Sequence, residues 1–247
     1  MRFTTFATIV FLARLAWAYG LPGACSGNCD AHDPAIIQRD SDKLFYRFWT
    51  ADGISIASAP DISGPWTFLG KALPAGTTIS SFAGVTNLWA PDVSFHNGMY
   101  YMYYAVSAGF GSQTSAIGVA TSLSLDPGTW TDHGSVGVSS TTGSPYNAID
   151  PNLIQVGSSY YLNFGSFWGD IYQVKMNPSL LTIDTGAPTA HLASTFWGFP
   201  PVPTAMEASY MYYRVVGGRR RGKNTACESV GLEILTRISK TSLAKVA

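Results

Sequence analysis

Short runs of apolar and aromatic residues alternate with turn-forming residues along most of the chain. Three of these runs are strongly aromatic, at residues 43–49, 99–104 and 159–164. Aromatic and β-branched residues favour strands, and runs of this length are too short for ordinary helices. Gly and Pro mark the turns between the runs, and Asn97-Gly98 is a strong hairpin signal. The pattern predicts an all-β protein.

An acidic residue opens a short apolar strand at regular steps along the chain. These acids are Asp33, Asp92, Asp150 and Glu207, which follow one another at intervals of 59, 58 and 57 residues. A fixed period of this length in a strand-rich sequence is typical of radially repeated folds. Four strands per repeat around an axis form a β-propeller, in which equivalent positions of all blades face one central funnel. The repeated acids are therefore expected to converge on one site.

The repeat divides the chain into three blades and the start of a fourth. The blades are expected at residues 33–87, 90–139 and 149–183, and a long connection over 184–205 leads to the fourth. The expected strands are Ala35–Gln38, Leu44–Thr50, Ile54–Ala59, Trp66–Leu69, Asp92–Phe95, Met99–Ser107, Ala116–Thr121, Trp130–His133, Tyr160–Phe164, Asp170–Met176 and Ala208–Tyr213. Trp66 and Trp130 open the fourth strands of two blades, where we expect them to pack between blades.

The repeat stops inside the fourth blade. A tyrosine-rich second strand should follow residues 215–218, but the chain continues with Arg219-Arg220-Arg221-Gly222-Lys223. Residues 233–238 fit either a strand or a helical turn. A frame error or a mis-spliced intron gives this kind of abrupt change. Our hypothesis is therefore that the chain forms about three and a half blades and that the atypical basic tail, 214–247, is a gene-model artefact. The alternative is that this tail binds anionic partners.

Composition and charge are those of a rigid extracellular β protein. Aromatic residues make up 13% of the chain and charged residues only 12%. Segment 214–247 holds eight basic and two acidic residues, which leaves seven basic and thirteen acidic residues in the body. An acidic body lacks the electrostatic footprint of a nucleic-acid-binding protein. We expect no nucleic-acid partner.

The first 18 residues have the features of a signal peptide. Arg2 precedes an apolar stretch over 3–15, and Ala16-Trp17-Ala18 fits a cleavage site. The stretch is too short to span a bilayer, so we expect a secreted protein without a membrane anchor and a main domain over 19–213. Cys25 and Cys29 are close enough in sequence to form a disulfide in an oxidising compartment, with Cys227 left over.

Five motifs then occur in a specific order. They are His32-Asp33-Pro34, Leu88-Trp89-Ala90-Pro91-Asp92-Val93, Ser115-Ala116-Ile117-Gly118, Asn147-Ala148-Ile149-Asp150-Pro151-Asn152 and Asn163-Phe164-Gly165-Ser166-Phe167-Trp168. Together, over residues 22–213, they resemble the fungal endo-1,5-α-L-arabinanases of glycoside hydrolase family 43. The resemblance implies a five-bladed β-propeller, an inverting mechanism, and arabinan or pectin side chains of the plant cell wall as substrate.

The same resemblance implies roles for three of the acids. Asp33 matches the general base, Glu207 the general acid, and Asp150 the acid that tunes the pKa of the general acid and orients it. An inverting glycosidase needs a carboxylic acid and a carboxylate roughly 6.5–9.5 Å apart, with room for water between them. Repulsion from Asp150 is expected to favour a protonated Glu207, and His32 is expected to help Asp33 stay ionised. We expect Asp92 to bond backbone groups between blades.

A sugar polymer also needs aromatic surfaces and hydrogen-bonding partners. The residues expected to bind substrate are Trp89, Gly111, Asn147, Ala148, Ile149, Ser166, Phe167 and Trp168. No cofactor is expected for the chemistry. The resemblance implies a structural calcium ion on the propeller axis, but its ligands cannot be identified in this sequence. We expect a monomer.

Two other functions fit the same residues. One is an exo-acting arabinofuranosidase or xylosidase of the same fold, which product lengths from linear arabinan would distinguish. The other is a non-catalytic or degenerate carbohydrate-binding propeller, because the repeat is not completed. Sugar binding without turnover would identify it.

Overall fold

The computed structural model describes residues 23–81, 84–194, 205–218 and 227–239. All regular elements in these residues are β-strands, which confirms the all-β prediction. No helix among the described residues is long and apolar enough to cross a membrane. The predicted signal peptide, 1–18, lies outside the described residues.

The first sheet has four antiparallel strands in the order β1-β2-β4-β5. They are β1 (Ala35–Gln38), β2 (Phe45–Trp49), β4 (Ser55–Ala59) and β5 (Thr67–Lys71). Each of the four strands predicted for the first blade is therefore present, with ends shifted by one or two residues. Consecutive strands pair through short turns, as expected of one blade.

The second sheet repeats this order and adds one short strand from the first repeat. It is formed by β3 (Ala51–Asp52), β6 (Asn87–His96), β7 (Met99–Ser107), β8 (Ser115–Ser122) and β9 (Thr131–Ser140), in the order β3-β6-β7-β8-β9. Asn97 and Gly98 have φ angles of 52° and 81°. These positive angles are those of a tight hairpin turn, and the hairpin predicted there is confirmed.

The third sheet contains a strand that the sequence pattern missed. Its order is β10 (Asn152–Val156), β11 (Ser159–Phe164), β12 (Ile171–Lys175) and β13 (Ala190–Ala193). The prediction ended this blade near Ile183 and treated 184–205 as a connection, which is wrong for β13. The strand is only four residues long and contains no β-branched or aromatic residue, so its sequence carries no strand signal.

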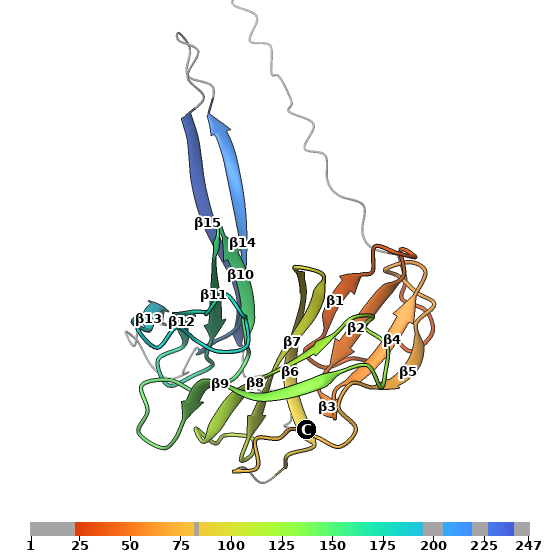
Figure 1. Ribbon diagram of the computed structural model, residues 1–247, viewed down its shortest axis with the longest axis horizontal. Helices are drawn as coiled ribbons and strands as arrows, with labels where there is room; N and C mark the ends of the chain where they lie inside the picture. Colours follow the sequence, from red (N-terminus) through yellow and green to blue (C-terminus); the bar gives the residue numbers. More distant parts are fainter. Residues whose placement is uncertain (1–22, 82–83, 195–204, 219–226, 240–247) are drawn as a thin grey trace, which may run out of the picture.

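The fourth sheet is a two-stranded antiparallel ribbon of β14 (Ala205–Gly218) and β15 (Cys227–Ser239). Residues 233–238 are part of β15, so the strand alternative holds for them. In Figure 1 this blue ribbon extends well beyond the three other sheets. The fourth sheet thus has two long strands, whereas each of the other three sheets has four or five strands.

The first strands of the sheets are neighbours in chain order, with β1 beside β6, β6 beside β10, and β10 beside β14. Figure 1 shows the sheets following one another around an open arc. This is the arrangement of consecutive propeller blades, although the described strands do not close into a ring. Closure with five blades stays a proposal.

The core lies between the faces of neighbouring sheets. Phe48 of the first sheet and Tyr104 of the second belong to one buried cluster, and Trp130 meets Phe48 edge-to-face with ring centroids 5.5 Å apart. The packing predicted for Trp130 is confirmed. Trp66 instead packs against Ala57 and Ala59 of its own sheet, so the same prediction is wrong for Trp66.

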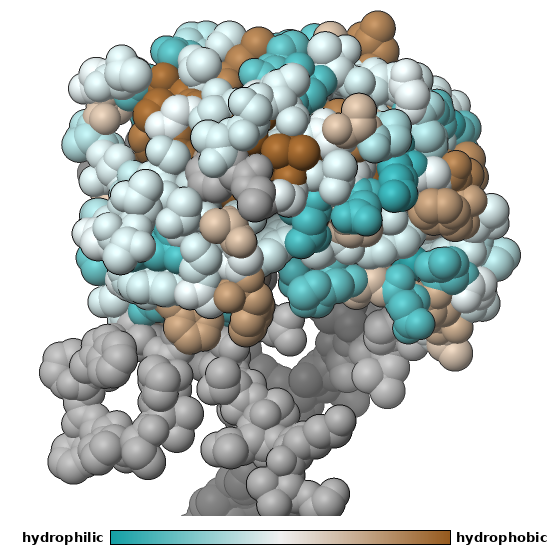
Figure 2. All heavy atoms as spheres, turned by 90° about the horizontal axis from the view of Figure 1, so that it is seen from below, coloured by the Kyte–Doolittle hydropathy of each residue, from teal (hydrophilic) through white to brown (hydrophobic). Residues whose placement is uncertain are grey.

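A second buried cluster joins the second and third sheets. It includes Tyr103, Val119, Leu162 and Phe164, all with at most 1% of their surface exposed. The aromatic strands are therefore packing elements. On the face of the molecule seen in Figure 2, the exposed apolar residues are scattered among polar ones rather than gathered into one large patch.

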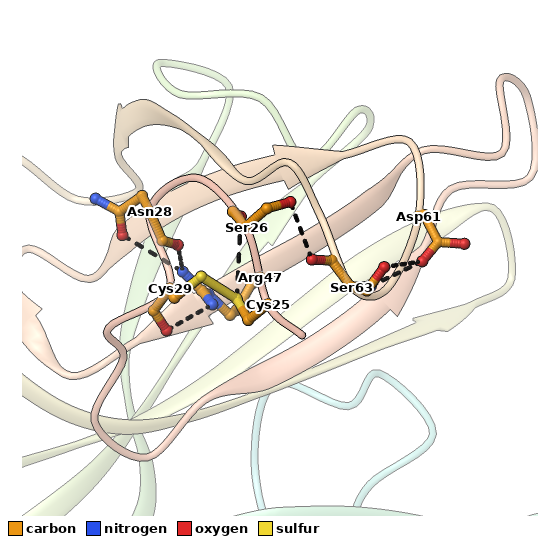
Figure 3. Close-up of a disulfide and its surroundings, with 7 residues drawn as sticks. All are labelled: Cys25, Ser26, Asn28, Cys29, Arg47, Asp61 and Ser63. Carbon is orange, nitrogen blue, oxygen red and sulfur yellow. Dashed lines mark hydrogen bonds between the residues drawn. A yellow bond between two sulfur atoms is a disulfide. The ribbon is translucent and has the colours of Figure 1, made fainter. Parts of the chain in front are cut away.

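A disulfide joins Cys25 and Cys29 ahead of the first sheet, as the sequence suggested. Figure 3 shows the guanidinium of Arg47 under this small loop, where it donates to the carbonyl oxygens of Asn28 and Cys29. The same guanidinium lies 4.6 Å from the ring centroid of Trp66. The N-terminal loop is therefore fastened to the outer face of the first sheet.

Candidate active site

Four equivalent backbone positions converge where the first strands of the sheets begin. Asp33, Ala90, Asp150 and Ala208 all have positive φ angles, of 48°, 41°, 56° and 51°. In the first and third sheets the residue two positions later begins the strand, and in the second and fourth the strand pairing is irregular there. Non-glycine residues rarely adopt this conformation, and such residues cluster at functional sites.

These positions correct the predicted equivalence of the four acids. Only Asp33 and Asp150 occupy the same position of the repeat. Asp92 lies two residues beyond its equivalent position at Ala90, and Glu207 lies one residue before Ala208. The near-equal sequence intervals therefore do not correspond to equal positions in the sheets. A difference of one or two residues matters because the side-chain direction changes with each step along a strand.

A pocket of about 300 Å³ lies between the four strand starts. It is lined by residues 33–36, 90–93, 150–152 and 208–210. The pocket therefore takes a contribution from every sheet, and it brings the side chains of Asp33, Asp92 and Asp150 to its wall. Convergence of the acids from separate blades, as the sequence predicted, is seen for these three.

Asp33 contacts a hydroxyl group from its own sheet. Thr50 donates from Oγ1 to Asp33 Oδ2 over 3.2 Å, and His32 Nδ1 lies 3.5 Å from the same oxygen. Thr50 Oγ1 also accepts the backbone N–H of Ala90 over 2.8 Å. The Asp33 side chain is 29% exposed, so water can reach it. A hydrogen-bonded, accessible carboxylate is the arrangement that a general base requires.

Asp150 lies in the most strongly perturbed environment of the site. Desolvation raises the pKa of Asp150 to about 7, repulsion from Asp33 and Glu207 adds to the effect, and the backbone N–H of Ala208 opposes it. That N–H donates to Asp150 Oδ2 over 3.1 Å. Carboxyl groups from the first and fourth sheets therefore act on Asp150 at the start of the third. Strongly perturbed carboxyl groups in a pocket are typical of functional sites.

Glu207 is held by the loop that follows β11. Ser166 donates from Oγ to Glu207 Oε2 over 3.1 Å, and Asp170 Oδ1 accepts the backbone N–H of Met206 over 3.1 Å. The loop thus fixes both the carboxylate of Glu207 and the backbone directly before it. Glu207 is beside the pocket and not among the residues that line it.

Asp92 links two sheets. Its carboxylate accepts the backbone N–H of Leu153 over 2.8 Å and a weaker hydrogen bond from the side chain of Asn152. Desolvation raises the pKa of Asp92 to about 6, and these two hydrogen bonds act in the opposite direction. The structural role expected for Asp92, bonding backbone between blades, is confirmed.

None of the residues expected to bind substrate is among those that line the pocket. Asn147 and Ala148 are buried, and Ala148 donates its N–H to Ser140. Phe167 and Trp168 follow one another with φ angles of 54° and 44°, and 43% of Trp168 is exposed. An exposed ring held in a strained loop is suited to a sugar surface.

The four remaining residues expected to bind substrate each have a different environment. Ser166 is directed to Glu207, and Ile149 accepts the backbone N–H of Gly165 over 2.8 Å. Trp89 is half-buried in β6, and Gly111 is in an exposed loop with a φ angle of 77°. Substrate contact by these residues stays a prediction.

Two residues at the site were missed by the sequence analysis, namely Thr50 and Asp170. Thr50 directly follows an aromatic strand, and Asp170 was assigned to a strand when it belongs to the preceding loop. The register of the strands could have identified Thr50, because the pairing of β1 with β2 places Thr50 opposite Asp33. No sequence signal connects Asp170 with Met206, which is far away along the chain.

A metal site could not be assigned. Among the described residues, no group of three or more His, Cys, Asp or Glu side chains is arranged to hold a metal ion. The structural calcium ion that the family resemblance implies therefore stays a prediction without assigned ligands.

Comparison with known proteins identifies related sequences. A family profile described as "Glycosyl hydrolases family 43" matches residues 27–215. The "Probable arabinan endo-1,5-alpha-L-arabinosidase A" of Aspergillus clavatus is 55% identical over 183 residues, which are 74% of this chain and 56% of that protein. The "Arabinan endo-1,5-alpha-L-arabinosidase A" of Aspergillus aculeatus is 57% identical over 178 residues, 72% of this chain and 55% of that protein. The chain thus spans little more than half the length of these relatives.

Solved structures share the fold. The native arabinanase of Bacillus subtilis has a TM-score of 0.66 at 31% identity and is matched over 85% of this chain and 73% of its own. The "GH43 Endo-Arabinanase" of Bacillus licheniformis has a TM-score of 0.65 at 29% identity, with 88% and 75% covered. The exo-1,5-alpha-L-arabinanase from a bovine ruminal metagenomic library has a TM-score of 0.62 at 29% identity, with 83% and 71% covered.

Proposed function

The chain belongs to glycosyl hydrolases family 43, and on that premise we propose that it hydrolyses internal α-1,5-L-arabinofuranosyl linkages of arabinan. The observation that carries the proposal is that Asp33 and Asp150 line one pocket, with Glu207 beside it next to the pocket residue Ala208. Three carboxyl groups from three sheets meet beside an open pocket. Glycoside hydrolysis needs such a set, because its transition state resembles an oxocarbenium ion between an acid and a base.

In the proposed reaction Asp33 is the general base. It removes a proton from a water molecule as the water attacks the anomeric carbon. Glu207 is the general acid and gives its proton to the leaving glycosidic oxygen on the opposite face of the sugar. Attack from the face opposite to the leaving group inverts the anomeric configuration. Ser166 orients the acid by donating to Glu207 Oε2.

Asp150 is proposed to couple the acid and the base. Because like charges repel in both directions, a charge on Asp150 opposes a charge on either neighbour. Desolvation is the largest cause of its raised pKa, about 7, and repulsion from Asp33 and Glu207 adds to it. Near neutral pH Asp150 is therefore partly protonated, so its charge can respond to its two neighbours.

Substrate recognition is proposed to use the rim of the pocket. Trp168 and Phe167 offer aromatic surfaces on the same loop that supplies Ser166. Their rings, with centroids 6.3 Å apart, are set at a steep angle to each other and can contact successive sugars. Arabinan, or the arabinan side chains of pectin, is the partner this site fits.

We also propose that the protein is secreted and acts as a monomer. The N-terminal sequence supports secretion, and so does the disulfide of Cys25 and Cys29, because such bonds persist in oxidising compartments. A fold of the five-bladed propeller type, of which this chain forms about three and a half blades, belongs to the same proposal; it is supported by the arc of consecutive sheets and by the solved arabinanases that share the fold.

The test is release of reducing sugar from linear 1,5-α-arabinan by this chain, beside a Glu207→Ala variant. We expect activity that the variant loses by about 100-fold or more, the size of a general-acid contribution. Short oligosaccharides as first products identify endo cleavage, and arabinose alone would favour the exo-acting alternative. Binding of arabinan without turnover would refute the proposed reaction and favour a binding module.

A further inference from the structure

Thr50 lies opposite Asp33, at the end of the strand that pairs with β1. Its N–H donates to the carbonyl of His32 over 3.0 Å, which continues the β1–β2 pairing by one more step. Its side chain makes two contacts at once. Oγ1 accepts the N–H of Ala90 over 2.8 Å and lies 3.2 Å from Asp33 Oδ2.

These two contacts fix the direction of the hydroxyl. A threonine hydroxyl has one proton to donate and can accept through its lone pairs. The backbone N–H of Ala90 can only donate, so Thr50 Oγ1 is the acceptor there. Its own proton is then free to point at Asp33 Oδ2, and this hydrogen bond is strongest when the carboxyl group is ionised.

The hydroxyl is not required by the repeated architecture. In the third sheet the residue equivalent to Thr50 is Gly165, whose N–H donates to the carbonyl of Ile149. A Cβ atom at Gly165 would lie 1.9 Å from the carbonyl oxygen of Asp170, so no side chain fits there. The sheet is formed at that position without any hydroxyl, which makes the threonine of the first sheet a local feature.

Other charged and titratable groups also face Asp33. His32 contacts it from the same segment, and Asp150 repels it from the start of β10. Asp92 on β6 lines the same pocket, and Glu207 on β14 acts on Asp150. Among these neighbours, the hydroxyl of Thr50 is the group that donates a hydrogen bond to Asp33 Oδ2. A hydrogen bond donated to a carboxylate favours its charged form.

We propose that Thr50 is the positioning residue of the general base: its hydroxyl, oriented by the N–H of Ala90, holds the Asp33 carboxylate ionised and in one orientation. This role rests on the proposed function only in naming Asp33 the base. The effect on the charge of Asp33 is independent of any reaction.

The activity test compares Thr50→Val, which keeps the shape and removes the hydroxyl, with Thr50→Ser, which keeps the hydroxyl. We expect Thr50→Val to lower kcat on linear arabinan by about 10-fold or more with KM within about twofold, because orientation of a reacting group affects the chemical step. The acidic limb of its pH profile moves up by roughly one unit, the size of one hydrogen bond to a charged group. The kcat of Thr50→Ser should stay within about threefold of that of the unchanged chain, because serine retains the hydroxyl donor.

Thr131→Val, on the exposed first residue of β9, is the matched control and should leave kcat and the pH profile unchanged. The proposal is overturned if a folded Thr50→Val variant has the same kcat and pH profile as the unchanged chain. It is equally overturned if Thr50→Ser is as impaired as Thr50→Val.

A second measurement separates this proposal from the proposed function. The carboxyl carbon of Asp33 is titrated by NMR in the unchanged chain and in Thr50→Val, without substrate. We expect a higher midpoint in the variant, by roughly one pH unit. If the chain does not hydrolyse arabinan, the proposed function fails and this midpoint still decides the role of Thr50. An unchanged midpoint would overturn it.

Discussion

Asp33 and Asp150 occupy the same position in two sheets and differ in what surrounds them. Both precede a proline, both have a positive φ angle, and both lie at the wall of the same pocket. The backbone N–H of the next sheet reaches Asp150 directly, from Ala208, whereas the N–H of Ala90 reaches Asp33 through the hydroxyl of Thr50. The repeat therefore supplies the backbone position, and the neighbouring side chains assign the chemical role.

The proposed difference in role between Asp33 and Asp150 is tested most directly by neutralising each acid in turn. We expect Asp33→Asn to lower kcat on linear arabinan by about 10³- to 10⁴-fold, because no other group then accepts the proton of the attacking water. Asp150→Asn should cost less, about 10- to 100-fold, because an effect through a neighbour is smaller than direct proton transfer. Single-turnover rates on linear arabinan measure both.

The control for both variants is an unchanged circular dichroism spectrum. Equal losses from the two variants would mean that both carboxyl groups act directly on the substrate or water. The assignment of separate roles to Asp33 and Asp150 would then be wrong.

The next largest effect is expected from adding a side chain to the third sheet where the first has Thr50. In Gly165→Ala the new Cβ would lie 1.9 Å from the carbonyl oxygen of Asp170, at a φ angle of 122°. The chain must shift, and we expect a loss of at least about 3 kcal/mol in the free energy of unfolding. Denaturant unfolding measures it.

Gly143→Ala is a suitable control for this substitution. Gly143 also has a positive φ angle, 88°, but no atom lies within 4 Å of the added Cβ. Its variant should show only the smaller cost of the backbone conformation, about 1 kcal/mol. Similar losses at the two positions would show that the contact with Asp170 is not what excludes a side chain.

The sequence predicted the fold well where strands are aromatic and closely spaced. The hairpin at Asn97-Gly98 and the strands of the first sheet follow from local patterns, whereas in the second sheet β3 was not predicted and β6 and β9 extend beyond their predicted ends. The strand Ala190–Ala193 did not follow from a local pattern, because its strand conformation comes from pairing with β12 and not from its own residue types. Pairing partners that lie outside a segment leave no trace in its composition.

The sequence predicted which acids belong to the candidate site, but not how they are arranged in space. Family motifs identified Asp33, Asp150 and Glu207, and the structure brings these acids into electrostatic contact. Equal spacing suggested that Asp92 and Glu207 hold equivalent positions, which is wrong by two residues and one residue respectively. Thr50 and Asp170 were missed because they act across strand register and between sheets.

The charge of Asp150 is also expected to affect stability. The pKa of Asp150 is raised to about 7 in the folded chain from an ordinary value of 3.8. Between these values the folded state binds more protons than the unfolded state, so this contribution to stability falls as the pH rises and levels off above about 7. Asp150→Asn removes the titrating group. Relative to the unchanged chain, the variant should therefore gain about 4 kcal/mol between pH 4 and pH 8.

Urea unfolding of the two proteins at pH 4.5, 6 and 8 checks this prediction. The difference in unfolding free energy must grow with pH and then stay constant. A difference that shrinks with rising pH would mean that Asp150 is stabilised in its charged form. The comparison with Asp33 would then lose its electrostatic basis.

The smallest expected effect concerns His32, the other group that contacts Asp33 Oδ2. Its ring nitrogen lies 3.5 Å from that oxygen, but 76% of the side chain is exposed. Exposed ion pairs contribute at most about 1 kcal/mol because water and salt screen them. We therefore expect His32→Ala to change kcat by less than about threefold, much less than Thr50→Val changes it. Activity at low and at high salt measures the difference. A loss in His32→Ala as large as that in Thr50→Val would show that the exposed imidazole, rather than the oriented hydroxyl, controls the carboxylate of Asp33.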